Sequence, residues 1–220
     1  MRCTVDKKAW WRVCLVVSVV VPAASAWGCT GDDGGTPDAT DSFDAREALD
    51  LDATGYPQPP PPYGTAVDQR IDNLQFVDSD GNPLSLAGFY NDHGVKLLWV
   101  YATAGWCTAC AAESTALPGF WTTYHPQGLE ILGVVFQDNA GAPATTSYAR
   151  NYATRYGWPF WTASDEPFVL RPYFVDVSST PLNMLVDLTG MTIKVIEMGY
   201  TESTMRAHVE RYLAEIADRS

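Results

Sequence analysis

Basic side chains are scarce in this chain. Among its 220 residues, Lys and Arg number 14 against 26 Asp and Glu, and the formal net charge is -12 at pH 7. A strongly acidic surface repels the phosphate backbone of DNA or RNA. The composition therefore argues against a nucleic-acid partner.

Residues that bind metals are also few. The three histidines, His93, His125 and His208, are scattered singly, and a single Cys-x-x-Cys pair is present, Cys107 and Cys110. A structural zinc site takes four ligands. Because no second cysteine pair accompanies the first, a zinc site is disfavoured, and we expect neither a metal nor another cofactor.

The apolar run near the N-terminus, residues 13–26, is too short and too interrupted by proline to span a membrane. It follows a basic start and ends in small residues, which is the pattern of a secretory signal. We therefore expect residues 1–28 to be a signal peptide. The basic residues before the run are Arg2, Lys7, Lys8 and Arg12.

The end of this run, Ala26-Trp27-Gly28-Cys29, resembles a bacterial lipobox. The resemblance implies cleavage before Cys29 and a lipid on its sulfur, although Trp27 departs from the small or apolar residue usual there. Ordinary secretion after about Ala26, leaving Cys29 free, is the alternative. Lipidation is favoured because an unpaired thiol in an exported protein needs an explanation. The lipid would anchor the protein to the cell envelope, facing the periplasm.

Residues 29–65 have the composition of a linker. Residues 30–56 contain seven Asp and one Glu against a single Arg, and a proline run follows at 57–62. An acidic, Gly-rich segment cannot bury enough apolar surface to fold, and consecutive prolines form an extended spacer. The segment is interpreted as a stalk, with a proline-motif ligand as the alternative.

Residues 66–220 have the alternating apolar segments of one α/β domain. A right-handed crossover would place the 96–102 and 129–136 strands parallel, and a closing hairpin would add antiparallel strands. The predicted strands are 72–78, 83–86, 96–102, 129–136, 184–187 and 192–198, with a short extended piece at 158–162. The predicted helices are 109–123, 145–156 and 201–216, with one or two helical turns at 168–173.

The Cys107-Thr108-Ala109-Cys110 segment lies between the 96–102 strand and the following helix. Positions i and i+3 share a face of a helix, so the two sulfurs can bond without backbone movement. The N–H groups at a helix start stabilise a thiolate, which makes Cys107 the expected nucleophile and the deeper Cys110 the resolving thiol. Trp106 directly before the pair favours a redox-active disulfide over the alternative of a purely structural one.

The Ser179-Thr180-Pro181 segment directly precedes the 184–187 strand. With the cysteine pair, it makes residues 71–216 resemble the TlpA/ResA branch of thioredoxin-like oxidoreductases, within the wider redoxin group. That resemblance implies a thioredoxin fold: three α/β/α layers around a mixed sheet, with an N-terminal β-hairpin extension and a central insertion. It also implies a cis Thr180–Pro181 bond facing the cysteines, and substrate binding by Trp106, Thr180 and Pro181.

The chain departs from the family pattern in places. Thr108 and Ala109 separate the cysteines where many relatives have proline, and Tyr101 occupies the strand position of the buried acid in thioredoxins proper. Glu113 matches a glutamate common in this branch, three residues after the second cysteine. An exposed helix glutamate is the favoured interpretation of Glu113, and a role in proton transfer is the alternative.

The function that these features favour is a thiol–disulfide oxidoreductase, expected as a monomer, that reduces disulfides in exported client proteins with electrons from an upstream thiol donor. One alternative is a peroxiredoxin-like peroxidase. That reaction needs a Thr three residues before the reactive Cys and an upstream Pro, whereas Thr103 stands four before Cys107. Another alternative is a Cu(I)-binding module, because soft thiolates suit Cu(I).

Overall fold

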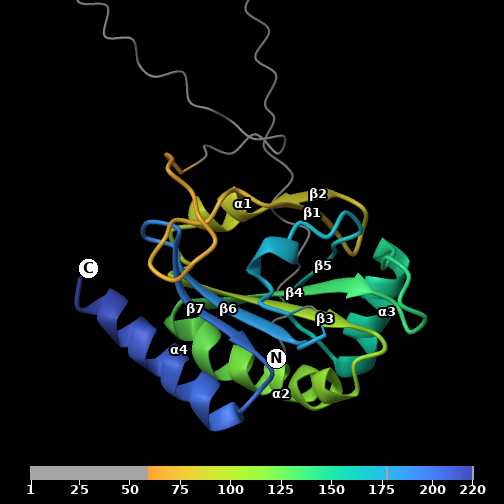
Figure 1. Ribbon diagram of the computed structural model, residues 1–220. Coiled ribbons are helices and arrows are strands. Elements are labelled where there is room, and N and C mark those ends of the chain that lie inside the picture. Colours follow the sequence, from red (N-terminus) through yellow and green to blue (C-terminus); the bar gives the residue numbers. More distant parts are fainter. Residues whose placement is uncertain (1–58, 177, 220) are drawn as a thin grey trace, which may run out of the picture. The chain divides into compact units, whose positions relative to one another are not determined.

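A computed structural model describes residues 59–176 and 178–219, which fold around a seven-stranded mixed sheet of order β2-β1-β5-β4-β3-β6-β7 (Figure 1). The strands are β1 (Gln75–Asp78), β2 (Pro83–Ser85), β3 (Leu97–Ala104), β4 (Leu129–Gln137), β5 (Trp161–Ser164), β6 (Leu182–Asp187) and β7 (Thr192–Met198). The helices are α1 (Leu86–Tyr90), α2 (Thr108–Tyr124), α3 (Thr146–Tyr156) and α4 (Glu202–Ala217), with 3-10 turns η2 (His125–Gln127) and η3 (Arg171–Tyr173).

The centre of the sheet is the β3–β4 pair. Every residue of β3 is buried, and so is all of β4 except its last residue, which fits strands with helices or loops on both faces. β3 and β4 are parallel through α2, β6 is antiparallel to β3, and β7 is antiparallel to β6. The predicted parallel crossover and closing hairpin are therefore confirmed.

Alternation along the strands divides the core into two layers. On β3, Leu97, Trp99 and Tyr101 pack in one cluster with residues of α2, α3 and α4, whereas Leu98 and Val100 pack in the other. Figure 1 shows α2 and α4 on one side of the sheet and α1 on the other. The predicted three layers are present, but the layer opposite α2 is thin. It consists of the five-residue α1, the η3 turn and loops.

The 158–162 segment, expected as a short extended piece, overlaps β5, which is a full member of the sheet and pairs parallel with β4 and antiparallel with β1. The helix α1 was not predicted, because five residues are too few to show a helical period. In the inserted α3–β5 segment, strand β5 lies between the N-terminal hairpin and the central strands.

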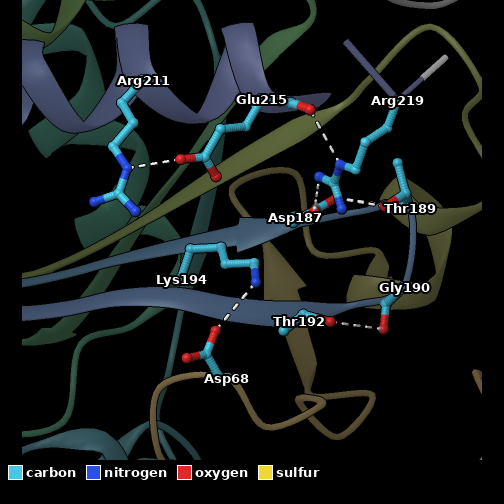
Figure 2. Close-up of polar contacts among 9 residues, drawn as sticks. All are labelled: Asp68, Asp187, Thr189, Gly190, Thr192, Lys194, Arg211, Glu215 and Arg219. Carbon is cyan, nitrogen blue, oxygen red and sulfur yellow. Dashed lines mark hydrogen bonds and ion pairs between the residues drawn. The ribbon is translucent and has the colours of Figure 1, made fainter. Parts of the chain in front are cut away.

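The outer edge of β7 is covered by the chain just before the hairpin. The backbone N–H groups of Asp68 and Ile71 donate to Ile193 and Met191, and Ile193 donates back to Gln69. Such pairing removes the free N–H and C=O groups of an edge strand. Figure 2 shows the ion pairs of this region: Lys194 with Asp68, Arg219 with Asp187, and Arg211 with Glu215.

Part of the predicted linker lies against the domain. The Arg70 side chain donates hydrogen bonds to the carbonyls of Pro60 and Gly190, and the Gly64 N–H donates to Arg70 O at 2.9 Å. The predicted signal peptide, the Cys29 lipidation site and linker residues 29–58 lie outside the described residues. Between residues 59 and 219, as far as they are described, no helix has the length and hydropathy needed to cross a membrane.

Candidate active site

Cys107 is the N-cap residue of α2. Its backbone is extended, and its Sγ accepts a hydrogen bond from the backbone N–H of Cys110 at 3.1 Å. Cys107 is joined to Cys110 by a disulfide, with 5.3 Å between their Cα atoms. The predicted position of Cys107 just before the first helical turn is confirmed. In the reduced protein the same N–H and the helix start would stabilise a thiolate on Cys107.

The two sulfurs differ in depth. Cys107 is 7% exposed, whereas Cys110 is 0% exposed and lies one turn into the helix. An incoming thiolate or disulfide therefore reaches Cys107 first. The order predicted from the sequence, with an outer cysteine and a deeper one, is the order in the structure.

The loop before β6 lies against the disulfide. The Thr180–Pro181 peptide bond is cis, as predicted. Cys107 Sγ lies 3.7 Å from the carbonyl oxygen of Thr180, and Cys110 Sγ lies 3.9 Å from Thr180 Oγ1. The Gly199 N–H donates to Pro181 O at 2.8 Å, which fixes the loop to the end of β7.

Trp106 lies at the surface beside the pair. Its side chain is 40% exposed, and its Nε1 donates to Gln137 Oε1 at 2.9 Å. Its ring meets the edge of Phe136, which stacks on Phe168 at 4.7 Å and also contacts Phe174. The sequence did not indicate this aromatic cluster, because Phe168 and Phe174 lie in an irregular segment far along the chain.

Asp165 organises the segment that carries Phe168. Its buried carboxylate accepts the N–H groups of Val169 at 2.7 Å and Leu170 at 3.0 Å, just before η3. Burial raises the pKa of Asp165, and these backbone hydrogen bonds oppose the rise. Asp and Pro are frequent turn residues, and the sequence here is Asp165-Glu166-Pro167. That signal could have indicated the turn but not its place beside the cysteines.

Glu113 corrects the sequence interpretation. It was expected to be an exposed helix residue, but it is 0% exposed, and its Oε2 accepts an N–H of Asn183 at 3.3 Å. Burial raises the pKa of Glu113 to about 9, and the Asn183 hydrogen bond opposes the rise. The signal was present: Glu113 follows Cys110 by three positions, so it shares the face of α2 that packs on the sheet.

Tyr101 fills the position where thioredoxins proper carry an acid. Its hydroxyl donates to Cys110 O at 3.0 Å and lies 2.9 Å from Ser114 Oγ. Ser114 in turn bonds Tyr152, whose hydroxyl reaches Thr103. Burial raises the pKa of Tyr101 well above its usual value, and the charge of Glu113 adds to the rise. A neutral hydroxyl chain therefore fixes the first turns of α2 to β3 and α3.

No protein-family model matches the chain, and no curated protein matches its sequence. Solved structures do match. A hypothetical protein from Sinorhizobium meliloti 1021 has a TM-score of 0.58 and 21% identity, over 72% of this chain and 88% of that one. A thiol:disulfide interchange protein of the thioredoxin family from Chlorobium tepidum has a TM-score of 0.54 and 19% identity, over 68% and 99%.

The thioredoxin domain of a thiol-disulfide oxidoreductase from Bacteroides vulgatus matches with a TM-score of 0.53 and 20% identity, over 68% of this chain and 99% of that one. The chain has the thioredoxin fold. The fold implied by the sequence resemblance is thereby confirmed, and this thioredoxin fold brings together five of the predicted site residues: Trp106, Cys107, Cys110, Thr180 and Pro181.

Proposed function

We propose that the chain is a thiol–disulfide oxidoreductase. The observation that carries the proposal is the Cys107–Cys110 disulfide at the start of α2, with the outer sulfur facing the carbonyl of Thr180. A sulfur that is nearer the surface than its partner and accepts a hydrogen bond from a backbone N–H has what disulfide exchange requires.

The reaction follows from the two positions. In the reduced protein, the Cys107 thiolate attacks one sulfur of a client disulfide, that S–S bond breaks, and the other client sulfur leaves as a thiolate. Cys110 then loses its proton and attacks the Cys107 sulfur, which releases the second client thiolate and forms the Cys107–Cys110 disulfide. The client gains two electrons, and an upstream thiol donor must return two electrons to this protein.

Glu113 is the group suited to move the proton of Cys110. Its pKa of about 9 is close to that of an ordinary thiol, and it lies on the same buried face of α2 one turn further on. Proton transfer by a positioned carboxyl group is general acid–base catalysis. In its carboxylate form Glu113 accepts the proton when Cys110 attacks, and in its acid form it returns the proton when Cys110 leaves.

The client segment binds beside the Thr180–Pro181 loop. The Thr180 carbonyl faces Cys107, and its backbone offers hydrogen bonds to an extended chain, as in the addition of a strand. The exposed Trp106 ring supplies an apolar surface next to the outer sulfur. Affinity would come from the main chain, so several clients of different sequence are expected.

The setting of this activity is proposed from the N-terminal sequence. A signal at residues 1–28 and a lipid on Cys29 would place a monomer on the cell envelope, facing the periplasm. Its clients would be exported proteins whose cysteines, haem-attachment cysteines included, must stay reduced.

The peroxidase alternative has less support. Thr103, the threonine nearest the position that it needs, hydrogen-bonds Tyr152 at 3.2 Å, and Tyr152 belongs to the cluster on the α2 side of the sheet. The cysteines belong to the cluster of the opposite layer. A peroxide assay and a Cu(I) titration of the reduced protein would test the two remaining alternatives directly.

The test is a trapping experiment with the full-length chain. Cys3, Cys14 and Cys29 are changed to Ser in every sample, so that only the pair can react. The Cys110→Ser variant should accumulate mixed disulfides with a model client, because its Cys107 attacks and nothing resolves the product. The Cys107→Ser variant should accumulate none. Equal trapping by both variants, or by neither, contradicts the proposal.

A further inference from the structure

Two oxygen atoms in the interior of the described residues lack a hydrogen-bond partner: Glu113 Oε1 and Tyr200 Oη. Nearly all buried polar atoms in proteins are hydrogen-bonded, because an unpaired one loses its bonds to water and gains none. Both atoms belong to groups that can gain or lose a proton. Each therefore needs a partner that the side chains around it do not supply.

Asn183 links the Glu113 carboxyl to the backbone next to Tyr200, and the charge of Glu113 acts on the Tyr200 hydroxyl. Asn183 Oδ1 accepts the indole N–H of Trp99 at 2.7 Å, and since an indole nitrogen only donates, the orientation of the amide is fixed. Its Nδ2 lies 3.3 Å from Glu113 Oε2 and 2.9 Å from Gly199 O. Gly199 directly precedes Tyr200, so one amide joins the Glu113 carboxyl to the chain at Tyr200.

The same amide decides where the acid proton lies. Asn183 donates its two N–H groups to Glu113 Oε2 and Gly199 O, so it has no N–H left to donate to Glu113 Oε1. Because Oε2 accepts an N–H, the proton of neutral Glu113 belongs on Oε1. That O–H needs an acceptor, and after ionisation the same oxygen needs a donor. A hydroxyl group or a water molecule can be either.

We propose that Tyr200 is a positioning residue for Glu113, and that the two side chains hold one internal water between Glu113 Oε1 and Tyr200 Oη. The two oxygens do not bond directly, and a water between polar groups satisfies both. In the neutral acid, the Glu113 O–H donates to this water. In the carboxylate, the water donates to Oε1 and accepts the O–H of Tyr200.

Of Glu113, Tyr200 and Tyr101, Glu113 is the group that ionises at the lowest pH. Burial raises the pKa of Tyr200 to about 12, with Glu202 and Glu113 adding to the rise and Arg206 opposing it. Tyr101 on β3 also has a raised pKa. Both tyrosines stay neutral while Glu113 ionises, so Tyr200 sets the pH of that ionisation through the water. Its effect on the proton of Cys110 rests on the proposed function, whereas the water site itself does not.

The first test is a pH titration of the glutamate carboxyl carbons by NMR in the oxidised full-length protein. Glu113→Gln identifies the signal. Tyr200→Phe should raise the Glu113 midpoint by about 0.5 to 1 pH unit, a three- to tenfold change, since the carboxylate loses its donor. Tyr212→Phe is the matched control, because its hydroxyl already has a partner, the carbonyl oxygen of Lys194 at 3.2 Å. An unchanged midpoint in Tyr200→Phe overturns the proposal.

A high-resolution crystal structure of the unmodified protein gives a second test that does not depend on a variant. A water should lie about 2.6–3.2 Å from both oxygens. A dry gap, or a direct bond between the side chains, overturns the proposal. Neither test needs turnover. If the water and the shifted midpoint are found but the protein shows no disulfide exchange, only the proposed function is contradicted. If the protein exchanges disulfides but neither the water nor the shifted midpoint is found, only the role of Tyr200 is contradicted.

Discussion

Glu113 makes the stability of the fold depend on pH. Its pKa rises from 4.5 to about 9 on folding, chiefly through burial. Between those values the folded state binds the proton more strongly than the unfolded state. The contribution of Glu113 to the free energy of unfolding is therefore complete below pH 4.5, declines as pH rises, and is lost above about pH 9.

Glu113→Gln should remove this dependence. The free energy of unfolding of the oxidised wild type should fall between pH 5 and pH 9 with a slope of at most about 1.4 kcal/mol per pH unit, and that of the variant should stay nearly flat. Denaturant unfolding across this range measures the difference. Glu166→Gln, at an exposed position, is the control and should follow the wild type. Parallel curves for Glu113→Gln and the wild type would show that Glu113 is ionised in the fold.

At the level of elements, the organisation of α2 depends on an irregularity inside it. Pro118 lies within the helix and has no N–H, so the carbonyl of Ser114, four residues earlier, has no helical donor. The indole N–H of Trp158, just after α3, donates to that carbonyl at 2.9 Å. The insertion thus supplies a hydrogen bond that the helix itself lacks, and it links α3 to the helix that carries the cysteines.

The place of Trp158 leads to a prediction for β4. A Cβ at Gly133 would lie 2.3 Å from the Trp158 ring, in a strand that is buried on both faces. Gly133→Ala should therefore reduce the free energy of unfolding by about 1–3 kcal/mol, the usual cost of overpacking. Guanidinium unfolding followed by tryptophan fluorescence measures it. A stability equal to that of the wild type would mean that the ring moves aside without cost.

Gly119 gives the opposite prediction within α2. A Cβ there meets no heavy atom within 4 Å, and the residue is exposed in the helix interior. Gly119→Ala should raise the free energy of unfolding by about 0.5–1 kcal/mol, because alanine loses less backbone entropy in a helix. The same unfolding measurement applies. A loss of stability would indicate that α2 needs flexibility next to Pro118.

At the scale of the whole molecule, one ion pair ties the end of α4 to the sheet. Arg219 Nη2 lies 2.5 Å from Asp187 Oδ2 at the end of β6, and the Asp187 side chain is 3% exposed (Figure 2). Burial works to raise the pKa of Asp187, but the hydrogen bonds from Arg219 and Thr189 outweigh it and the pKa is lowered. The stability from this pair is present above the unfolded pKa of 3.8 and is lost as pH falls through the lower folded value.

Arg219→Ala should lower the free energy of unfolding by about 1 kcal/mol at pH 7, and the difference from the wild type should vanish as pH falls below the lowered folded pKa of Asp187. Arg211→Ala, which removes the exposed pair with Glu215 and the contact of the guanidinium with the Tyr212 ring, should cost less than Arg219→Ala. Thermal unfolding at several pH values compares them. Equal costs at pH 7 would mean that burial of Asp187 adds nothing to the pair.

The pattern of residues along the chain was enough to predict the central strands and helices and the position of the cysteine pair at the start of a helix. Buried strands read as unbroken apolar runs, and the spacing of Cys107 and Cys110 by itself places them on one helical face. The cis bond at Pro181 and its position beside the cysteines came from resemblance, because sequence spacing alone does not bring segments 70 residues apart together. Short elements such as α1 and β5 carried too few residues to show a period.

The tertiary structure alone decided which polar side chains are buried. Glu113 was expected to be an exposed helix residue, and only the packing of α2 against the sheet places it inside. Local spacing fixes which residues share a face. Whether a carboxyl group on that face is ionised depends on how far distant parts of the chain bury it. Here burial raises the pKa of Glu113 to about 9, so that it is mainly a neutral acid near pH 7.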